Sequence, residues 1–480
     1  MTLSTPSTKA RPRAGWTFAI VSVALFMVTL DNLVVSTALP TIRVDLGASL
    51  ESLAWTVNAY TLAFAVLLLA GAALGDRFGR KRMFAVGIAL FTASSAAAAL
   101  APSAGALVAA RALQGAGAAM VLPLTLTLLN EAVAPAKRGL AIGAWSGISG
   151  LGVALGPVVG GAVVEGISWH WIFWLNVPTG LILIPLALRY LTESHGPANR
   201  LDFPGLGLAG FGLLGVVYGI VRGEDLGWTS TPIVASIAAG LALLAGFVAW
   251  ERRSPAPMLP LRFFKSRAFT ATNGVSFAMF FGVFGSIFLL SQFFQTTQGL
   301  SPLQAGLRVL PWTLMPMFVA PVAGILSDRI GARPLMASGL ALQAIAIAWL
   351  AAVTTPTVAY SALIVPFVLA GTGMALVFAP AANSVLSSVK PEEAGQASGA
   401  TNAIRELGGV LGVSVLASVF TAHGGYGSPQ DYVDGMTAAL PIGAAVLAAG
   451  ALLALLIPRH RRVVETDEAT ASTVLAEAAL

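Results

Sequence analysis

Four charged residues stand deep inside long apolar stretches of this sequence: Asp31, Arg111, Arg405 and Glu406. A charged side chain within a membrane-spanning helix costs roughly 2.5–3.5 kcal/mol on insertion scales, so such a residue usually faces a protein cavity and has a function. A carboxylate in that setting can bind and release a proton, and a cationic ligand can compete with the proton for it. The residue types therefore indicate proton-linked chemistry at Asp31, with Arg111 as a candidate electrostatic partner.

The positions of Asp31 and Arg111 along their apolar stretches predict that they meet. Asp31 is about 21 Å from the start of its stretch near residue 17, at 1.5 Å per helical residue. Arg111 enters the membrane from the opposite side near Ala104 and is about 10 Å deep. In a hydrocarbon core about 30 Å thick, these depths are similar. We expect the two residues to share a cavity and to be electrostatically coupled. The alternative is a static ion pair that only orders two helices.

Arg405 and Glu406 are neighbours in a later apolar stretch. Consecutive side chains on a helix point about 100° apart, so these two cannot both face one partner. Arg405 is about 14 Å from the start of its stretch near residue 396. It either faces the cavity opposite Asp31 or neutralises a carboxylate elsewhere. Glu406 is either a second protonation site or a structural hydrogen-bonding group.

The composition of the chain indicates an integral membrane protein. Of its 480 residues, 56% are hydrophobic and only 10% are charged, with a mean hydropathy of +0.82. Soluble proteins carry about 25% charged residues. Cysteine is absent, which excludes a disulfide framework, a thiolate metal site and a thiol nucleophile.

Apolar stretches of about 20 residues, the length that crosses a bilayer, predict fourteen membrane spans and an all-α fold. The spans begin near residues 17, 52, 83, 104, 139, 171, 202, 231, 268, 303, 334, 358, 396 and 438.

The distribution of positive charge predicts the orientation of the chain. Of the 27 Lys and Arg residues, Arg43 and Arg222 fall in loops on one side and Arg111, Arg308 and Arg405 inside spans, while the other 22 share the side of the termini. Lys and Arg are retained in cytoplasmic loops, so both termini are predicted to be cytoplasmic. The net charge of +6 is therefore a sign of topology and does not indicate a nucleic-acid partner.

Two sequence features recur at nearly the same offset. Asp76 and Asp328 head similar loops 252 residues apart, and Gly143, Gly152 and Gly156 match Gly399, Gly408 and Gly412 at an offset of 256. The repeat predicts two six-helix halves with two inserted helices between them, a common plan for transporters. The predicted segments are an N-terminal segment (1–16), a first half (17–190), the inserted helices (191–267), a second half (268–457) and a tail (458–480).

The fifth span contains a series of glycines around one proline: Gly143, Gly152, Gly156, Pro157, Gly160 and Gly161. Glycine and proline are tolerated in a membrane helix where another helix packs very closely against it. Gly152, Gly156 and Gly160 share one helical face. A second face lies nearly opposite and consists of Gly143, Gly147, Gly150, Ala154 and Gly161. We expect a thin, bent helix between close neighbours, one from each half.

These motifs, in this order, resemble the fourteen-span drug:proton antiporter branch of the major facilitator superfamily. The resemblance rests on Leu30–Pro40 in the first span, Asp76–Lys81 in the following loop, Arg111–Gly117 in the fourth span, the glycine series in the fifth, Trp169–Pro178 and Arg405–Gly409. The chain departs from the family pattern at three positions: Ala72 stands for glycine, His170 for arginine and Glu406 for glutamine.

The resemblance also implies roles for the loop residues and for the glycine series. The loop charges would form a cytoplasmic gate, in which Asp76 lies near a helix N-terminus of the other half, where anions are favoured. The gate residues are Asp76, Arg77, Arg80, Lys81, Asp328 and Arg329. The glycine series would be the antiporter helix-packing motif.

Motifs for other chemistry are absent or out of context. Gly205–Gly210 fits a dinucleotide-binding pattern but follows no strand, and no lysine follows a glycine as in a phosphate-binding loop. The four histidines lack metal-ligand spacing. We expect no cofactor, no metal, no nucleotide and no enzymatic activity.

The sequence thus predicts a proton-coupled secondary exporter of small amphiphilic molecules, such as antibiotics or several drugs, working by alternating access in the cell membrane. Its partners would be a small-molecule substrate, protons and the lipid bilayer, without nucleic acid. A proton-linked transporter of a single metabolite and a non-transporting membrane sensor or scaffold are the alternatives.

Overall fold

The structure is a computed structural model that describes residues 14–134, 138–196, 202–255, 257, 259–390 and 393–458. These residues form α-helices and one short 3₁₀ helix, with no strand among them. The first helices are α1 (Ala14–Leu46), α2 (Leu50–Phe78), α3 (Arg80–Ala99), α4 (Ala104–Ala132), α5 (Arg138–Gly166), α6 (Trp171–Trp174) and α7 (Asn176–Tyr190). Next come α8 (Phe203–Leu226), α9 (Thr231–Glu251) and the 3₁₀ helix η2 (Leu261–Lys265). The last are α10 (Arg267–Thr296), α11 (Pro302–Thr313), α12 (Met315–Ile330), α13 (Ala332–Val353), α14 (Tyr360–Ser387), α15 (Ala394–His423) and α16 (Pro429–Ala454).

Thirteen helical segments of the described residues are long and apolar enough to cross a membrane. The predicted fifth span is α5, a helix of 29 residues. It is not among the thirteen because its continuously described part, Leu155–Gly166, is shorter than a membrane span. The structure thus agrees with the all-α prediction, and with fourteen spans once α5 is included.

Two of the predicted spans are interrupted helices. Span six consists of α6 and α7, which meet at Leu175, and span ten consists of α11 and α12, which meet at Leu314. Pro316 follows the second break closely, and proline lacks the N–H that would continue the helical hydrogen bonds and restricts the residue before it. The proline therefore explains the break in span ten.

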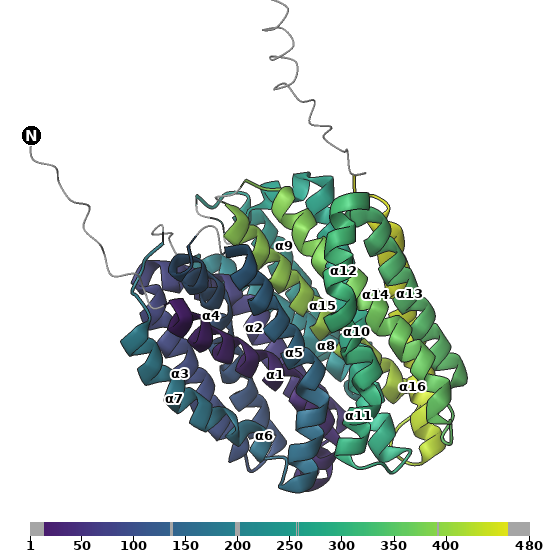
Figure 1. Ribbon diagram of the computed structural model, residues 1–480. Helices are drawn as coiled ribbons and strands as arrows, with labels where there is room; N and C mark the ends of the chain where they lie inside the picture. Colours follow the sequence, from purple (N-terminus) through teal and green to yellow (C-terminus); the bar gives the residue numbers. More distant parts are fainter. Residues whose placement is uncertain are drawn as a thin grey trace, which may run out of the picture.

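The helices run back and forth between two faces of the molecule. We call the face where the described chain begins and ends the termini face, and the opposite one the far face. Figure 1 shows the N-terminal helices, purple to teal, beside the C-terminal helices, green to yellow, with α5 close to α11. The pair α8 and α9 pack on each other, and α8 also contacts α2 and α15.

The two similar loops, which begin at Asp76 and Asp328, make the same turn. Gly79 and Gly331 both have positive φ, 105° and 84°. Each donates its N–H to a residue one helical turn earlier, Gly75 at 3.0 Å and Ser327 at 2.9 Å. Positive φ is easily adopted only by glycine, so the shared turn explains why both loops have glycine at this position.

Arg43 and Arg222 differ from the sequence prediction. Both were expected in loops, but Arg43 lies in the last turn of α1 and Arg222 lies within α8. Both are close to the far-face ends of their helices, where a long cationic side chain can reach the interface.

Candidate functional site

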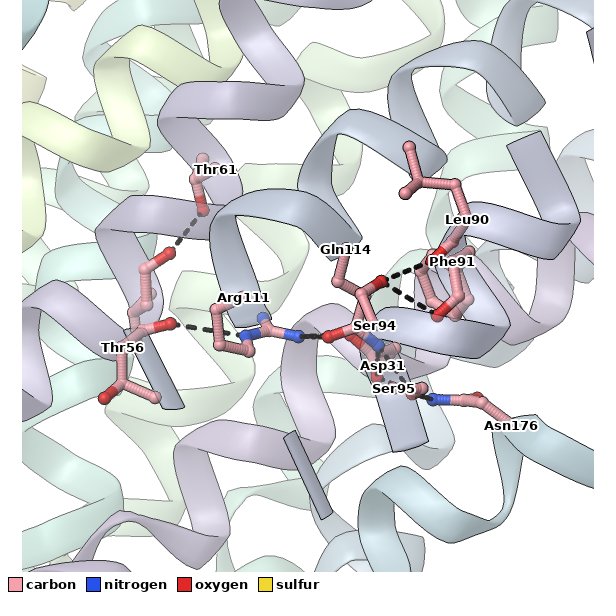
Figure 2. Close-up of polar contacts among 11 residues, drawn as sticks. Asp31, Thr56, Thr61, Leu90, Phe91, Ser94, Ser95, Arg111, Gln114 and Asn176 are labelled. Carbon is pink, nitrogen blue, oxygen red and sulfur yellow. Dashed lines mark hydrogen bonds and ion pairs between the residues drawn. The ribbon is translucent and has the colours of Figure 1, made fainter. Parts of the chain in front are cut away.

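The structure joins Asp31 and Arg111 in a buried ion pair. Arg111 Nη1 lies 2.5 Å from Asp31 Oδ2, and both side chains are only 1% exposed. Asp31 comes from α1 and Arg111 from α4, and Figure 2 shows their side chains pointing toward each other. The sequence predicted similar depths for Asp31 and Arg111, and in the structure the two side chains are in direct contact.

Three further polar side chains complete this network. Gln114 Nε2 donates to Asp31 Oδ1 and to Ser95 Oγ, both at 2.9 Å. Asn176 Nδ2 donates to the same two oxygens, at 2.8 and 2.9 Å. The Gln114 carbonyl oxygen in turn accepts from Arg111 Nη1 at 2.6 Å. The network therefore links helices α1, α3, α4 and α7 (Figure 2).

Helix α2 contributes the remaining contacts of Arg111. Arg111 Nε donates to the Thr56 backbone oxygen at 3.3 Å, and the guanidinium carbon lies 4.2 Å from the centre of the Tyr60 ring. A buried ion pair is tolerated only when its other hydrogen-bonding groups are also satisfied, and loss of one partner costs about 3–5 kcal/mol. This pair has such support from residues of α2, α3, α4 and α7.

Sequence reasoning did not identify Gln114, Ser95 or Asn176. Gln114 follows Arg111 by three residues, so both lie on the same side of α4, and this spacing is the signal that could have identified it. Ser95 and Asn176 carry no comparable signal, because serine and asparagine are common near helix ends. Only the packing of α3 and α7 against α1 brings them to Asp31.

Arg405 and Glu406 form a second, separate polar centre on α15. The Arg405 guanidinium carbon lies 5.5 Å from the centre of the Phe378 ring and 5.9 Å from that of Phe280. Arg405 Nε and Nη2 and Glu406 Oε2 are buried and have no hydrogen-bond partner within the part of the chain that the structure describes. Unpaired buried groups of this kind are costly. The centre therefore has polar atoms that can bind a ligand, a proton or water.

One face of α5 packs directly on α1. A Cβ atom added at Gly152, Gly156 or Gly160 would lie 3.0, 2.7 and 2.8 Å from atoms of Thr29, Leu33 and Val34, respectively. Glycine at these positions therefore lets the two helices approach more closely than any other residue would.

The end of α5 packs on α11, which belongs to the C-terminal part of the chain. A Cβ at Gly161 would overlap the Pro302 backbone oxygen, and one at Gly306 would overlap the Pro157 backbone oxygen. Glu165 Oε2 accepts a hydrogen bond from the Leu303 N–H at 3.2 Å, at the N-terminus of α11. Gly147 and Gly150, expected on the second close face, have open space beside them, and the surroundings of Gly143 lie outside the described residues.

Further contacts hold α1 to the C-terminal helices near the far face. Gln295 Nε2 donates to the Thr37 backbone oxygen at 2.8 Å, and the Arg43 guanidinium carbon lies 3.5 Å above the Tyr426 ring. The Tyr426 hydroxyl donates to Gln292 Oε1 at 2.5 Å. Burial raises the pKa of Tyr426, so this hydroxyl remains a donor at physiological pH. Together with the α5–α11 contact, these interactions join the N-terminal and C-terminal parts of the chain near the far face.

The predicted gate residues at the termini face form an ion network. Arg80 Nη2 lies 2.7 Å from Asp76 Oδ1, and Arg80 Nη1 is paired with Glu131 at the end of α4. The segment after α7 also joins this network, since Gly196 donates its N–H to the Asp76 backbone oxygen at 3.2 Å. The contacts of Asp76 thus come from the N-terminal part of the chain.

The other predicted gate residues lie around this ion network or at the matching turn. The Lys81 N–H donates to Glu193 Oε1 at 2.9 Å, and the Arg77 guanidinium lies 5.3 Å from the Phe78 ring centre. Arg329 is exposed. The side chain of Asp328 lies outside the described residues.

Comparison with known proteins gives consistent matches along the chain. The family model of the Major Facilitator Superfamily matches residues 21–413 and 272–476. The tetracenomycin C resistance and export protein of Streptomyces glaucescens is 34% identical over 432 residues, covering 90% of this chain and 80% of that protein. The multidrug efflux pump LfrA of Mycolicibacterium smegmatis is 35% identical over 436 residues, covering 90% and 86%. The puromycin resistance protein pur8 of Streptomyces alboniger is 35% identical over 483 residues, covering 96% and 94%.

Solved structures share the fold at low sequence identity. A POT family transporter in complex with a thioalcohol-conjugated peptide matches with a TM-score of 0.68 at 14% identity, covering 92% of this chain and 95% of that one. The xylose transporter XylE from E. coli matches with a TM-score of 0.61 at 14% identity, covering 93% and 98%.

Proposed function

Because this chain belongs to the major facilitator superfamily, we propose that it is a proton-coupled exporter of small amphiphilic drugs or antibiotics. The named relatives are resistance and efflux proteins of this kind, and the chain is a multi-pass membrane protein with the fold of such transporters. A small molecule is thus its transported partner, and protons supply the driving force.

The observation that carries the proposal is the buried ion pair of Asp31 and Arg111. Ionised Asp31 is held by Arg111, Gln114 and Asn176. Protonation would remove its charge, weaken the attraction to Arg111 and so favour a different packing of α1 and α4. Such a coupled change of protonation and conformation is what allows a proton gradient to drive alternating access.

The second polar centre supplies a place for the substrate or for a second proton. Arg405 and Glu406 have buried polar atoms without partners among the described residues, and Phe280 and Phe378 flank Arg405. Aromatic rings favour flat, lipophilic molecules and cations. We place an amphiphilic substrate beside these residues, between the two six-helix halves, 17–190 and 268–457, with α8 and α9 as inserted helices.

Alternating access requires one face to open while the other closes. The far face is held closed by α5 on α11 and by α1 on the C-terminal helices. At the termini face, the ion network of Asp76 and Arg80 would serve as the gate that stabilises the opposite state. The excess of Lys and Arg at the termini face favours a cytoplasmic location for this face. We place the protein itself in the cell membrane.

A flux assay in proteoliposomes tests this function. With an imposed pH gradient, ethidium, puromycin and tetracenomycin C are offered in turn. The proposal predicts that at least one of them moves against the direction of the proton gradient. Movement with the protons would indicate a symporter of one metabolite, and no movement of any compound would support a sensor or scaffold.

Neutralising Asp76 is expected to reduce transport several-fold while the protein still inserts and folds. Asp76→Asn removes one partner of Arg80 but leaves Glu131, and partly exposed ion pairs contribute only about 0.2–1 kcal/mol to stability. The measurements are flux and the melting temperature of the purified protein. Arg82→Ala, which removes a 72% exposed charge from the same turn, is the matched control and should transport normally. Loss of folded protein in Asp76→Asn would show that the residue is structural.

A further inference from the structure

A cavity with a mixed polar and apolar lining lies between α2, α8 and α15 on the side of the far face. Its volume is about 160 Å³, and its lining includes the hydroxyls of Ser49, Ser414, Ser418 and Thr421 and the carboxylate residue Glu51. Ser49 and Thr421 are exposed, Ser418 is 7% exposed and Ser414 is fully buried. Thr421 and Ser414 are seven residues apart on α15, which is about 10 Å along a helix. The cavity thus extends from the exposed rim into the interior.

The inner end of the cavity carries a polar contact between helices of the two halves. Asn58 Nδ2 on α2 donates to Ser414 Oγ on α15 at 2.8 Å, and Ser414 donates in turn to the Val410 backbone oxygen at 2.7 Å. Asn58 is fully buried, yet its Oδ1 has no hydrogen-bond partner among the described residues. A buried amide oxygen without a hydrogen-bond partner is costly, and ordered water in a cavity can satisfy such a group.

The same end of the cavity is at the depth of the Asp31 network. Asn58 lies two residues after Thr56, whose backbone oxygen accepts from Arg111 Nε, and two residues before Tyr60, whose ring lies under the Arg111 guanidinium. Residues two apart on a helix point in nearly opposite directions, so Asn58 and the groups that hold Arg111 are at similar depth on opposite sides of α2.

The inserted helix α8 forms one wall of the cavity. Val221 lines it, and the next residue, Arg222, pairs with Glu51 of α2 at 2.8 Å. Among the lining residues that the structure describes, Glu51 is the charged one, and α15 contributes hydroxyls and apolar groups. Arg222 neutralises this carboxylate, which suits the passage of water and protons more than the binding of a cation.

We propose that this cavity is an aqueous route by which protons from the far face approach the Asp31–Arg111 network, and that the inserted helix α8 supplies its wall. The proposal rests on the proposed function and deepens it: protons enter between α2, α8 and α15, apart from the substrate region at Arg405. It also gives the inserted helices a role in proton supply.

Cysteine labelling tests whether water enters the cavity from the far face. The chain has no cysteine, so each introduced thiol is the only target for a membrane-impermeant methanethiosulfonate reagent. We expect Ser414→Cys and Ser418→Cys to react from the far face at least about tenfold faster than Leu416→Cys, which is equally deep on α15 but fully buried outside the lining. Exposed Gln430→Cys sets the maximal rate. A Ser414→Cys thiol as inert as that of Leu416→Cys, or reactive only from the termini face, would overturn the proposal.

A second variant separates proton entry from substrate movement. Val221→Phe places a larger side chain in the part of the cavity lining that α8 supplies. Leu214→Phe adds the same ring at a 42% exposed position of α8 and is the control. The substrate is a compound that the flux assay identifies as transported. We expect Val221→Phe alone to slow labelling of Ser414→Cys and pH-driven transport of this substrate about tenfold, while its exchange at equal pH continues. Equal slowing of both transport modes would refute the proton route. Absence of transport of all three compounds by the unmodified chain would instead contradict the proposed function, whatever the labelling result.

Discussion

Replacing Asp31 with asparagine is expected to abolish pH-driven transport, with a loss of at least about a hundredfold, equivalent to about 2.7 kcal/mol. The asparagine side chain would keep the shape of the aspartate but could not release a proton. The flux measured under a pH gradient should then match the flux without one. Exchange of substrate at equal pH, which moves no net proton, should persist.

The alternative explanation, a static ion pair, requires a specific control. Asp31→Asn alone leaves Arg111 as a buried charge without its partner, and that could unfold the protein, since breaking such a pair costs about 3–5 kcal/mol. The double variant Asp31→Asn/Arg111→Gln removes both charges and should recover much of the melting temperature. If the double variant also regained a response to the pH gradient, Asp31 would have a structural role only.

Replacing Gly161 with leucine is expected to reduce transport at least about tenfold without preventing membrane insertion. Even a Cβ at this position would lie 2.6 Å from Leu303 Cα and overlap the Pro302 backbone oxygen. Backbone atoms cannot move aside as a flexible side chain can, so α5 and α11 would be held apart and the far face could not close.

Gly150→Leu is the matched control on the same helix, because a Cβ atom added at Gly150 would meet no neighbouring atom within 4 Å. It introduces the same side chain with the same cost in helix propensity. Flux and the reactivity of a cysteine near the far face, such as Thr37→Cys, should change only in Gly161→Leu. Normal transport by Gly161→Leu would show that the α5–α11 contact is not a moving joint.

The sequence was sufficient to predict the helices and the meeting of Asp31 with Arg111. Hydrophobic length defines the spans because the bilayer has a fixed thickness, and depth along a span follows from the rise of the helix. The rotation of each helix about its axis does not follow from length. Gln114, Ser95 and Asn176 could therefore be recognised as part of the network only from the packing.

The glycine series of α5 also has one property that the sequence predicts and another that depends on packing. Its spacing predicted a close-packed helix, and Gly152, Gly156 and Gly160 do form the face that contacts α1. The opposite face was expected to be equally close, but Gly147 and Gly150 have open space, and among the described glycines of that face Gly161 contacts the C-terminal part. Spacing identifies which residues share a face, whereas the neighbour of that face depends on long-range packing.

Proton and substrate movements measured together, without an imposed pH gradient, show whether Asp31 couples proton movement to export. Proteoliposomes containing the purified chain, a trapped pH-sensitive dye and a gradient of a compound that the flux assay identifies as transported start at equal pH on both sides. Coupling through Asp31 predicts that the substrate gradient alone drives protons in the direction opposite to the substrate, and that Asp31→Asn moves the substrate without moving protons. Protons that move with the substrate, or substrate flux in the unmodified protein without any proton flux, would contradict it.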